Sequence, residues 1–346
     1  MADRPRSFHC AVASDTLFMA CSDASIRSFA LSSAFTQRDQ SPRSHGENEA
    51  LRVACRSDGS VIASGGGDGV VALYPRHLAE PLDRFTCGGS EVYALQFESD
   101  TRLLVGCDNA LTRWDAVTAQ CVDKAEFEHG TALPVYGGAR NPERKCFVFD
   151  AHAQDGLVSV ALSDGSIQVV SADGFKPLHV LRTTDASSSS TTAAAAAAAA
   201  TSCRFAGDAL VTTAGDCAMV WDVRALRAPV LSVRSPDARL LYGARLMTGS
   251  DCLLTWGGEL VEAWTASSGK PQWRARLHGY PAFFVDEADG ALVVCGGGQG
   301  RPPDAACCHD HGAKRPRTDH GGFYVLCDVA TQRRGVICGD FVAFAD

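Results

Sequence analysis

A short strand–turn–strand pattern recurs along the chain and constrains its fold more than any other feature of the sequence. Each copy has an apolar run, a tight turn rich in Gly, Asp, Ser or Asn, and a second apolar run. Steps such as Asp-Gly and Gly-Gly supply the positive φ angles that two-residue hairpin turns require, so each copy is predicted to be a β-hairpin. The copies lie at 17–29, 61–74, 103–115, 157–170, 209–222, 252–264, and 292–298 continued at 322–328.

Further apolar runs flank these hairpins and extend each copy to a four-stranded unit. One run precedes a hairpin at 92–97, for example, and another follows a hairpin at 177–181. The units are spaced roughly 40 to 55 residues apart, which is the period of a propeller blade. No long helical periodicity competes with this pattern. We predict an all-β fold in which residues 1–346 form a single domain, a seven-bladed β-propeller of four-stranded antiparallel blades.

The two ends of the chain both offer strands that could join the first blade to the last. The apolar segment 8–13 either opens the first blade or completes the last sheet, and the tail at 341–344 could pair there as well. Some pairing is expected, because an open ring would leave two unpaired sheet edges. The sequence leaves open which of these pairings forms.

Two of the seven copies end in a Trp-Asp pair, at Trp114-Asp115 and Trp221-Asp222. In this respect the chain resembles the WD40-repeat family, and the resemblance extends over most of the sequence. Five copies lack the pair and no Gly-His dipeptide occurs. The resemblance therefore implies that the hydrogen-bonded tetrad common in this family is missing from most blades. It also implies a propeller that holds other proteins, although it does not identify the individual member.

Charge and composition exclude several classes of function. The formal net charge is -8 and the basic residues are scattered, whereas nucleic-acid binding needs a concentrated positive surface. Nucleic acid is therefore not expected as the main partner. The odd number of cysteines, 15, and the lack of an apolar stretch after Met1 favour a reducing compartment. No run of roughly 18 apolar residues occurs, so no membrane span is expected. We predict a cytoplasmic or nuclear protein.

Three polar or low-complexity segments, 37–49, 183–200 and 299–321, are predicted to be flexible inserts. The second contains a run of eight alanines, which is too short to be a stable helix by itself. The third splits the last hairpin.

The last insert carries residue types that could bind zinc or an import receptor. Cys307-Cys308-His309-Asp310-His311 and His320 are potential zinc ligands, but their spacing is not that of a zinc knuckle, and no metal is predicted. The basic residues Lys314, Arg315 and Arg317 form a candidate nuclear-import signal, or simply a solvated run of charge.

The sequence contains no familiar catalytic pattern. It has neither a Gly-x-Ser-x-Gly elbow nor a His-Glu-x-x-His helix, and the glycine-rich segment 296–300 lacks the Gly-Lys-Ser/Thr ending of a phosphate loop. We therefore predict a protein that is not an enzyme, with no cofactor and no small-molecule substrate. A propeller-based hydrolase, similar to the esterase of diphthamide synthesis, is an alternative that no group of residues supports.

The stretch Trp221-Asp222-Val223-Arg224 resembles the WDxR box of propellers that dock on the adaptor of cullin-4 ubiquitin ligases. We predict that Trp221 is buried and that Asp222 accepts hydrogen bonds from backbone N–H groups of the following turn. Arg224 should then point into solvent. These three residues are the predicted partner-binding site. The alternative is an ordinary blade turn whose arginine is merely exposed.

The function predicted from the sequence is a non-enzymatic scaffold or adaptor within a multiprotein complex. Loops displayed on a rigid repeat scaffold are where binding residues concentrate, and the expected partners are other proteins. Two alternatives belong to the same broad class. One is a substrate receptor of a cullin-4 ubiquitin ligase, which depends on Arg224. The other is a nuclear RNA-processing scaffold.

Overall fold

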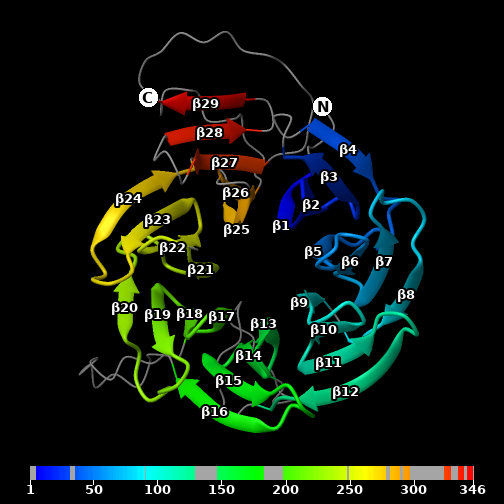
Figure 1. Ribbon diagram of the computed structural model, residues 1–346, viewed down its shortest axis with the longest axis horizontal. Coiled ribbons are helices and arrows are strands. Elements are labelled where there is room, and N and C mark those ends of the chain that lie inside the picture. The colour runs from blue at the N-terminus through cyan, green and yellow to red at the C-terminus, as the bar shows by residue number, and fades with distance from the viewer. Residues whose placement is uncertain are drawn as a thin grey trace. The chain divides into compact units, whose positions relative to one another are not determined.

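The described part of the chain is built from β-strands, and no α-helix occurs in it (Figure 1). The computed structural model describes residues 5–31, 36–89, 91–128, 146–182, 198–247, 249–277, 281–288 and 291–296. It also describes the backbone of three later strands, at 323–328, 334–338 and 341–345. No helix that could cross a membrane is found within these ranges.

Consecutive strands form small antiparallel sheets, the blades of a β-propeller. The chain divides into two compact units: Met1–Phe85, Trp256–Val261 and Arg274–Asp346 make up unit 1, and Thr86–Thr255 with Glu262–Trp273 make up unit 2. The first two sheets belong to unit 1, apart from the last residue of β8. Their strands are β1 (Ser7–Ala13), β2 (Thr16–Cys21), β3 (Ile26–Ala30) and β4 (Thr36–Gln40), then β5 (Ala50–Cys55), β6 (Val61–Gly66), β7 (Val70–Pro75) and β8 (Asp83–Thr86).

Unit 2 contains three complete four-stranded sheets and most of a fourth. The strands of the first two are β9 (Val92–Phe97), β10 (Arg102–Cys107), β11 (Ala110–Asp115), β12 (Gln120–Glu126), β13 (Val148–Gln154), β14 (Leu157–Leu162), β15 (Ser166–Ser171) and β16 (Pro177–Arg182). Those of the next two are β17 (Ala200–Ala206), β18 (Ala209–Ala214), β19 (Cys217–Asp222), β20 (Leu231–Arg234), β21 (Gly243–Leu246), β22 (Cys252–Gly257), β23 (Leu260–Thr265) and β24 (Pro271–Arg276).

The last sheet differs from the predicted blade. It has five strands, β25 (Ala282–Ala288), β26 (Ala291–Gly296), β27 (Phe323–Asp328), β28 (Arg334–Cys338) and β29 (Phe341–Ala345). The prediction of four strands per blade is therefore met by six sheets and is wrong for this one. The apolar tail forms the extra strand, because β29 pairs with β28 along its whole length. The N-terminal segment instead opens the first blade, since β1 pairs with β2.

Strand sequences follow their position within a blade. The second strand of a blade is buried on both faces, as in β14, whose sequence is apolar apart from Ser159 and does not alternate. The outermost strand is exposed on alternate or most residues, as in β12. Gly69, with φ 71°, lies in the β6–β7 turn, where a side chain would be strained.

Apolar cores join neighbouring blades within each unit. One cluster combines Leu104 and Leu111 with Val148 and Val158, and so links the sheets β9–β12 and β13–β16. Equivalent clusters link β13–β16 to β17–β20, and β1–β4 to β5–β8. Each sheet therefore depends on its neighbour to bury its faces, as expected for a repeat protein.

The three predicted inserts have different outcomes. The segment 37–49 is only partly a loop, because 36–40 form β4 and His45 is buried, so the solvated loop predicted there is wrong for those residues. Most of the second insert lies outside the described residues, but Ala200 begins β17 and is fully buried. The insert 299–321 lies wholly outside them.

Candidate functional site

The turn between β19 and β20 carries the predicted partner-binding residues. Trp221, at the end of β19, is 4% exposed and packs in the core that links sheets β13–β16 and β17–β20. Its indole Nε1–H donates a hydrogen bond to Thr212 Oγ1 on β18, at 2.9 Å. This contact satisfies the one polar atom of a large buried ring. The strand end before the turn is thereby fixed, as predicted.

Asp222 organises the turn that follows. Its Oδ1 accepts hydrogen bonds from the backbone N–H of Arg224 at 2.9 Å and from Arg224 Nε at 3.0 Å, and its Oδ2 accepts one from Nη2 at 3.1 Å. These bonds from the side chain and backbone of Arg224 lower the pKa of the Asp222 carboxyl. Asp222 therefore caps the turn, as predicted, and also holds the arginine side chain.

Arg224 lies on the surface in a defined orientation. Its side chain is 72% exposed, and its Nη1 lies 3.6 Å from Asp208 Oδ2 in the β17–β18 turn. The ion pairs of Arg224 with Asp208 and with Asp222 are both solvent-exposed and contribute little to stability. They do restrict the rotamers of a flexible side chain, which lowers the entropy lost when a partner binds.

The rest of this turn presents a mixed basic and apolar surface. Arg227 is exposed, and Val230 is 68% exposed, the second highest value among the large apolar side chains described as exposed. Val223 and Leu226 pack inward against the same core as Trp221. The inward residues hold the turn in place, and the outward residues are available for contact.

The other Trp-Asp pair provides an internal comparison. Asp115 Oδ1 accepts hydrogen bonds from the backbone N–H groups of Val117 and Thr118, both at 3.0 Å. Val117 occupies the position equivalent to Arg224 and is 69% exposed. Trp114 donates to Thr112 on its own strand rather than to the neighbouring strand. An aspartate side chain caps the backbone in both turns, but only the turn after Asp222 has an exposed arginine at this position.

A buried Ser–His–Asp group was not predicted from the sequence. His45 Nδ1 lies 3.0 Å from Asp68 Oδ1, and His45 Nε2 lies 2.8 Å from Ser64 Oγ. Burial lowers the pKa of His45 despite the neighbouring carboxylate. Ser64 is 0% exposed and His45 1% exposed, so no substrate can reach the hydroxyl. The group ties the β4–β5 loop to β6, and nothing in the local sequence around His45 shows which residues it meets.

The sequence predicts that most blades lack the tetrad, and the hydrogen bonds of the described residues include only parts of such networks. Besides the His45 group, Trp221–Thr212 and Trp264–Thr255 form buried tryptophan–threonine hydrogen bonds, at 2.9 and 3.0 Å. These pairs stabilise the second and third strands of their sheets.

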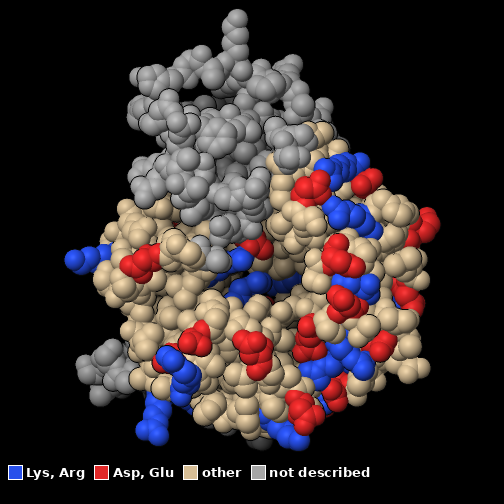
Figure 2. Space-filling model, viewed as in Figure 1, with Lys and Arg blue, Asp and Glu red and all other residues tan. Residues whose placement is uncertain are grey.

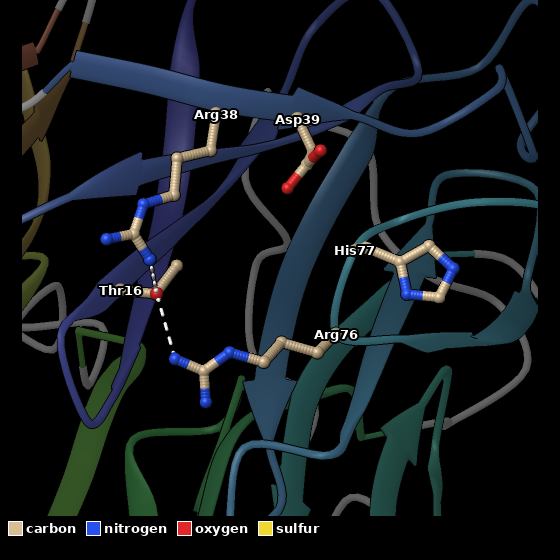
Figure 3. Close-up of a pocket in the computed structure, with 5 residues that line it drawn as sticks. All are labelled: Thr16, Arg38, Asp39, Arg76 and His77. Atoms are coloured by element: carbon tan, nitrogen blue, oxygen red, sulfur yellow. Dashed lines mark hydrogen bonds between the residues drawn. The ribbon is translucent and has the colours of Figure 1, made fainter.

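A small charged pocket of about 190 Å³ lies between the first two blades of unit 1 (Figure 3). Arg38 and Arg76 approach from different blades and each donates a hydrogen bond of 2.7 Å to Asp15. Both also donate to Thr16 Oγ1, at 3.0 and 3.2 Å (Figure 3). The hydrogen bond from Arg38 and the charge of both arginines lower the pKa of Asp15 to about 2.

Arg38 and Arg76 therefore form an ion-pair group with Asp15, which we call the clamp, and this group joins the two blades. Each guanidinium is already engaged by Asp15 and Thr16, and the remaining lining residues are Asp39 and His77. The clamp was missed by sequence reasoning because its members come from the β1–β2 turn, β4 and the residue after β7.

Charge on the surface is mixed. On the face shown, basic and acidic side chains are interspersed over the described residues (Figure 2). No group of three or more potential metal ligands occurs within the described ranges. The candidate import residues Lys314, Arg315 and Arg317, and the insert Cys307–His311 with His320, lie outside them.

Comparison with known proteins returns neither a matching family model nor a matching curated protein.

Proposed function

We propose that this protein is a non-enzymatic interaction scaffold of the WD40 type, with the sheet β25–β29 as its seventh blade. The observation that carries the proposal is the Trp221–Asp222–Arg224 turn, in which a buried anchor and a capping carboxylate hold an exposed arginine. Its partners are other proteins of a multisubunit assembly in the cytoplasm or nucleus.

The chemistry of the turn fits a protein partner. A guanidinium makes paired hydrogen bonds to a carboxylate, and arginine is enriched among the residues that dominate interface energies. Val230, on the same turn, adds apolar area beside the charge. A partner segment with an acidic residue next to an apolar one would match both features.

An enzymatic role has less support. The Ser64–His45–Asp68 group has the residue types of a hydrolase triad, but its serine is enclosed by the blade. A nucleophile must reach its substrate, so this group suits a structural role. We propose that the protein is not an enzyme and uses no cofactor.

A cullin-4 substrate receptor is the second candidate. It is favoured by the exposure of Arg224 and by its orientation through Asp222. In this version the arginine would dock on the adaptor of the ligase, and another surface would hold the substrate. No observation favours an RNA-processing scaffold over these two.

The test is quantitative affinity purification of the full chain and two variants. Arg224→Ala should lose a defined set of co-purifying proteins, whereas Val117→Ala, at the equivalent position of the other capped turn, should retain it. Truncating an interface arginine costs about 2 kcal/mol of binding, enough to lose a partner during washing. Both variants should melt within about 2 °C of the unmodified protein, because neither side chain is buried.

The identity of the lost proteins separates the two candidates. Loss of a cullin-4 adaptor supports the receptor, and loss of other proteins supports the general scaffold. An identical set of proteins with all three chains would refute a role for this turn.

A further inference from the structure

Two cysteines of unit 2 lie against each other where the chain enters the sheet β9–β12. Cys107 is the last residue of β10 and is 2% exposed. Cys87 lies in the loop between β8 and β9 and is partly exposed. Both side chains are thiols, and the S–H of Cys87 donates a hydrogen bond to Cys107 Sγ. The two sulfur atoms are therefore in direct contact.

The backbone of the same loop lies on Cys107 as well. Cys107 pairs with Val92, the first residue of β9, at a shift in the strand register. The N–H of Gly89 donates a second hydrogen bond to the Cys107 sulfur. A Cβ at Gly89 would lie 3.0 Å from Cys107 Sγ and 2.9 Å from Asp108 Cβ, so the absence of a side chain lets the loop come this close. The loop is thus placed on Cys107 by its backbone and not only by the thiol of Cys87.

The environment of the pair favours the loss of one proton. The hydrogen bond from Cys87 lowers the pKa of the Cys107 thiol against the opposing effect of burial. Where no second thiol is in contact, burial has the larger effect and raises the pKa of Cys21 and of Cys146 to about 12. Oxidants react with the thiolate rather than with the thiol. The contact between Cys87 and Cys107 therefore makes this pair more reactive than those buried cysteines.

The loop that carries Cys87 is also a connection between the two units of the chain. The first segment of unit 1 ends at Phe85, and unit 2 begins at Thr86. Residues 87–91 then lead into β9. A covalent bond between Cys87 and the end of β10 would fasten this connection to the sheet that follows it.

We propose that Cys87 and Cys107 are a redox-responsive pair, which a peroxide converts to a disulfide and a thiol reductant restores. A reversible bond of this kind suits the proposed location in the cytoplasm or nucleus, where disulfides are transient. The pair includes no residue of the Arg224 turn, so either proposal can fail without affecting the other.

The reaction balances with hydrogen peroxide as the oxidant. The sulfur that has lost its proton attacks one peroxide oxygen, the O–O bond breaks, and the hydroxide that leaves takes up a proton to form water. The second thiol then attacks the sulfenic sulfur, the S–S bond forms, the S–O bond breaks, and a second water leaves with the remaining proton. Two thiols and one peroxide thus give one disulfide and two waters, and the peroxide accepts two electrons.

The experiment maps the disulfide in the full chain. The reduced protein is treated with hydrogen peroxide, its remaining thiols are blocked with N-ethylmaleimide, and it is digested with trypsin without reduction. The three cysteines of this sheet and its entry loop fall in different tryptic peptides: Cys87 in 85–102, Cys107 in 103–113 and Cys121 in 114–124. Mass spectrometry should show 85–102 linked to 103–113, about tenfold above any other linked pair that contains Cys87, because the two sulfurs are held in contact. Dithiothreitol should remove the link.

Three variants serve as controls. Cys87→Ser should abolish the linked pair, and its partly exposed position makes it compatible with folding. Cys107→Ser should abolish it too, with thermal melting as the check on its buried site. Cys121→Ser changes an exposed cysteine of the same sheet and should leave the link unchanged.

Hydrogen exchange tests whether the disulfide fastens the connection between the units. Oxidation should slow the exchange of the amides in 87–91 in the unmodified chain, and Cys87→Ser should show no such change. A link from 85–102 to 114–124 in place of 103–113, or no link at all, overturns the proposal. Formation of the disulfide with unchanged exchange in 87–91 overturns its role as a fastening.

Discussion

Single buried polar atoms in this protein affect stability in opposite directions. Tyr74 is 0% exposed, and none of the described residues gives its hydroxyl a hydrogen bond. An unsatisfied buried hydroxyl costs about 1–3 kcal/mol, so Tyr74→Phe should leave stability unchanged or raise it by about 1 kcal/mol. Urea denaturation measures this change. Trp221→Phe, which deletes a satisfied Nε1–H and part of a buried ring, is the matched control and should destabilise. A clear loss of stability in Tyr74→Phe would contradict the prediction.

Two histidines with lowered pKa values, His45 and His152, make stability dependent on pH. Burial lowers the pKa of His45 below its ordinary value of 6.5 and lowers that of His152 to about 3. Since the folded state favours the neutral ring, the stabilising contribution is complete above pH 6.5 and is lost as pH falls below it. Each histidine should steepen this fall by up to about 1.4 kcal/mol per pH unit.

Denaturation at pH 7 and at pH 5.5 tests this dependence. His45→Asn and His152→Asn should each lose less stability between the two pH values than the unmodified chain does. Equal losses in all three proteins would mean that neither histidine is held neutral by the fold.

At the scale of an element, the end of β6 depends on the absence of a side chain at Gly66. A Cβ there would lie 2.2 Å from His45 Nδ1, whereas at Gly67 its nearest neighbour would be at an ordinary 3.7 Å. Gly66→Ala should therefore displace His45 and break its bonds to Ser64 and Asp68. We expect a loss of about 1–3 kcal/mol, as in other overpacked cores, and a much smaller change for Gly67→Ala. Similar melting temperatures for the two variants would contradict this.

The alanine-rich insert can be shortened only as far as the start of β17, at Ala200. Replacing 187–197 with a short Gly/Ser bridge should change the melting temperature by less than about 5 °C, because loop-closure entropy varies slowly with length. Extending the deletion to Ala200 should destabilise more. Ala200 is fully buried and pairs with Ala214 at the edge of the core around Trp221. Equal effects of the two deletions would mean that this strand end contributes nothing.

At the scale of the whole molecule, neighbouring blades of a unit should unfold together. Leu111 is 0% exposed on β11, yet its apolar cluster includes Val158 and Val160 of the next sheet. Leu111→Ala should cost about 2–5 kcal/mol and expose amides to hydrogen exchange in both sheets, β9–β12 and β13–β16. Increased exchange confined to β9–β12 would show that the blades are independent.

The sequence by itself determined the local structure within each blade. The hairpins, their turns and the burial of the second strand follow from local patterns, since a strand and its hairpin partner are adjacent in the chain. The buried Trp221 and exposed Arg224 followed from the same reasoning, because their positions are set by one strand end and one turn.

The tertiary structure decided what depends on distant segments. It determined that β1 opens the first blade and that β29 adds a fifth strand to the last sheet. It also brought His45 to Ser64, Asp15 between two arginines, and His152 to the backbone N–H of Phe205. Each of these contacts joins residues from different strands or blades, and their chemistry appears only when packing places them together. Local periodicity carries no information about such pairs, because it describes neighbours along the chain and not across a blade interface.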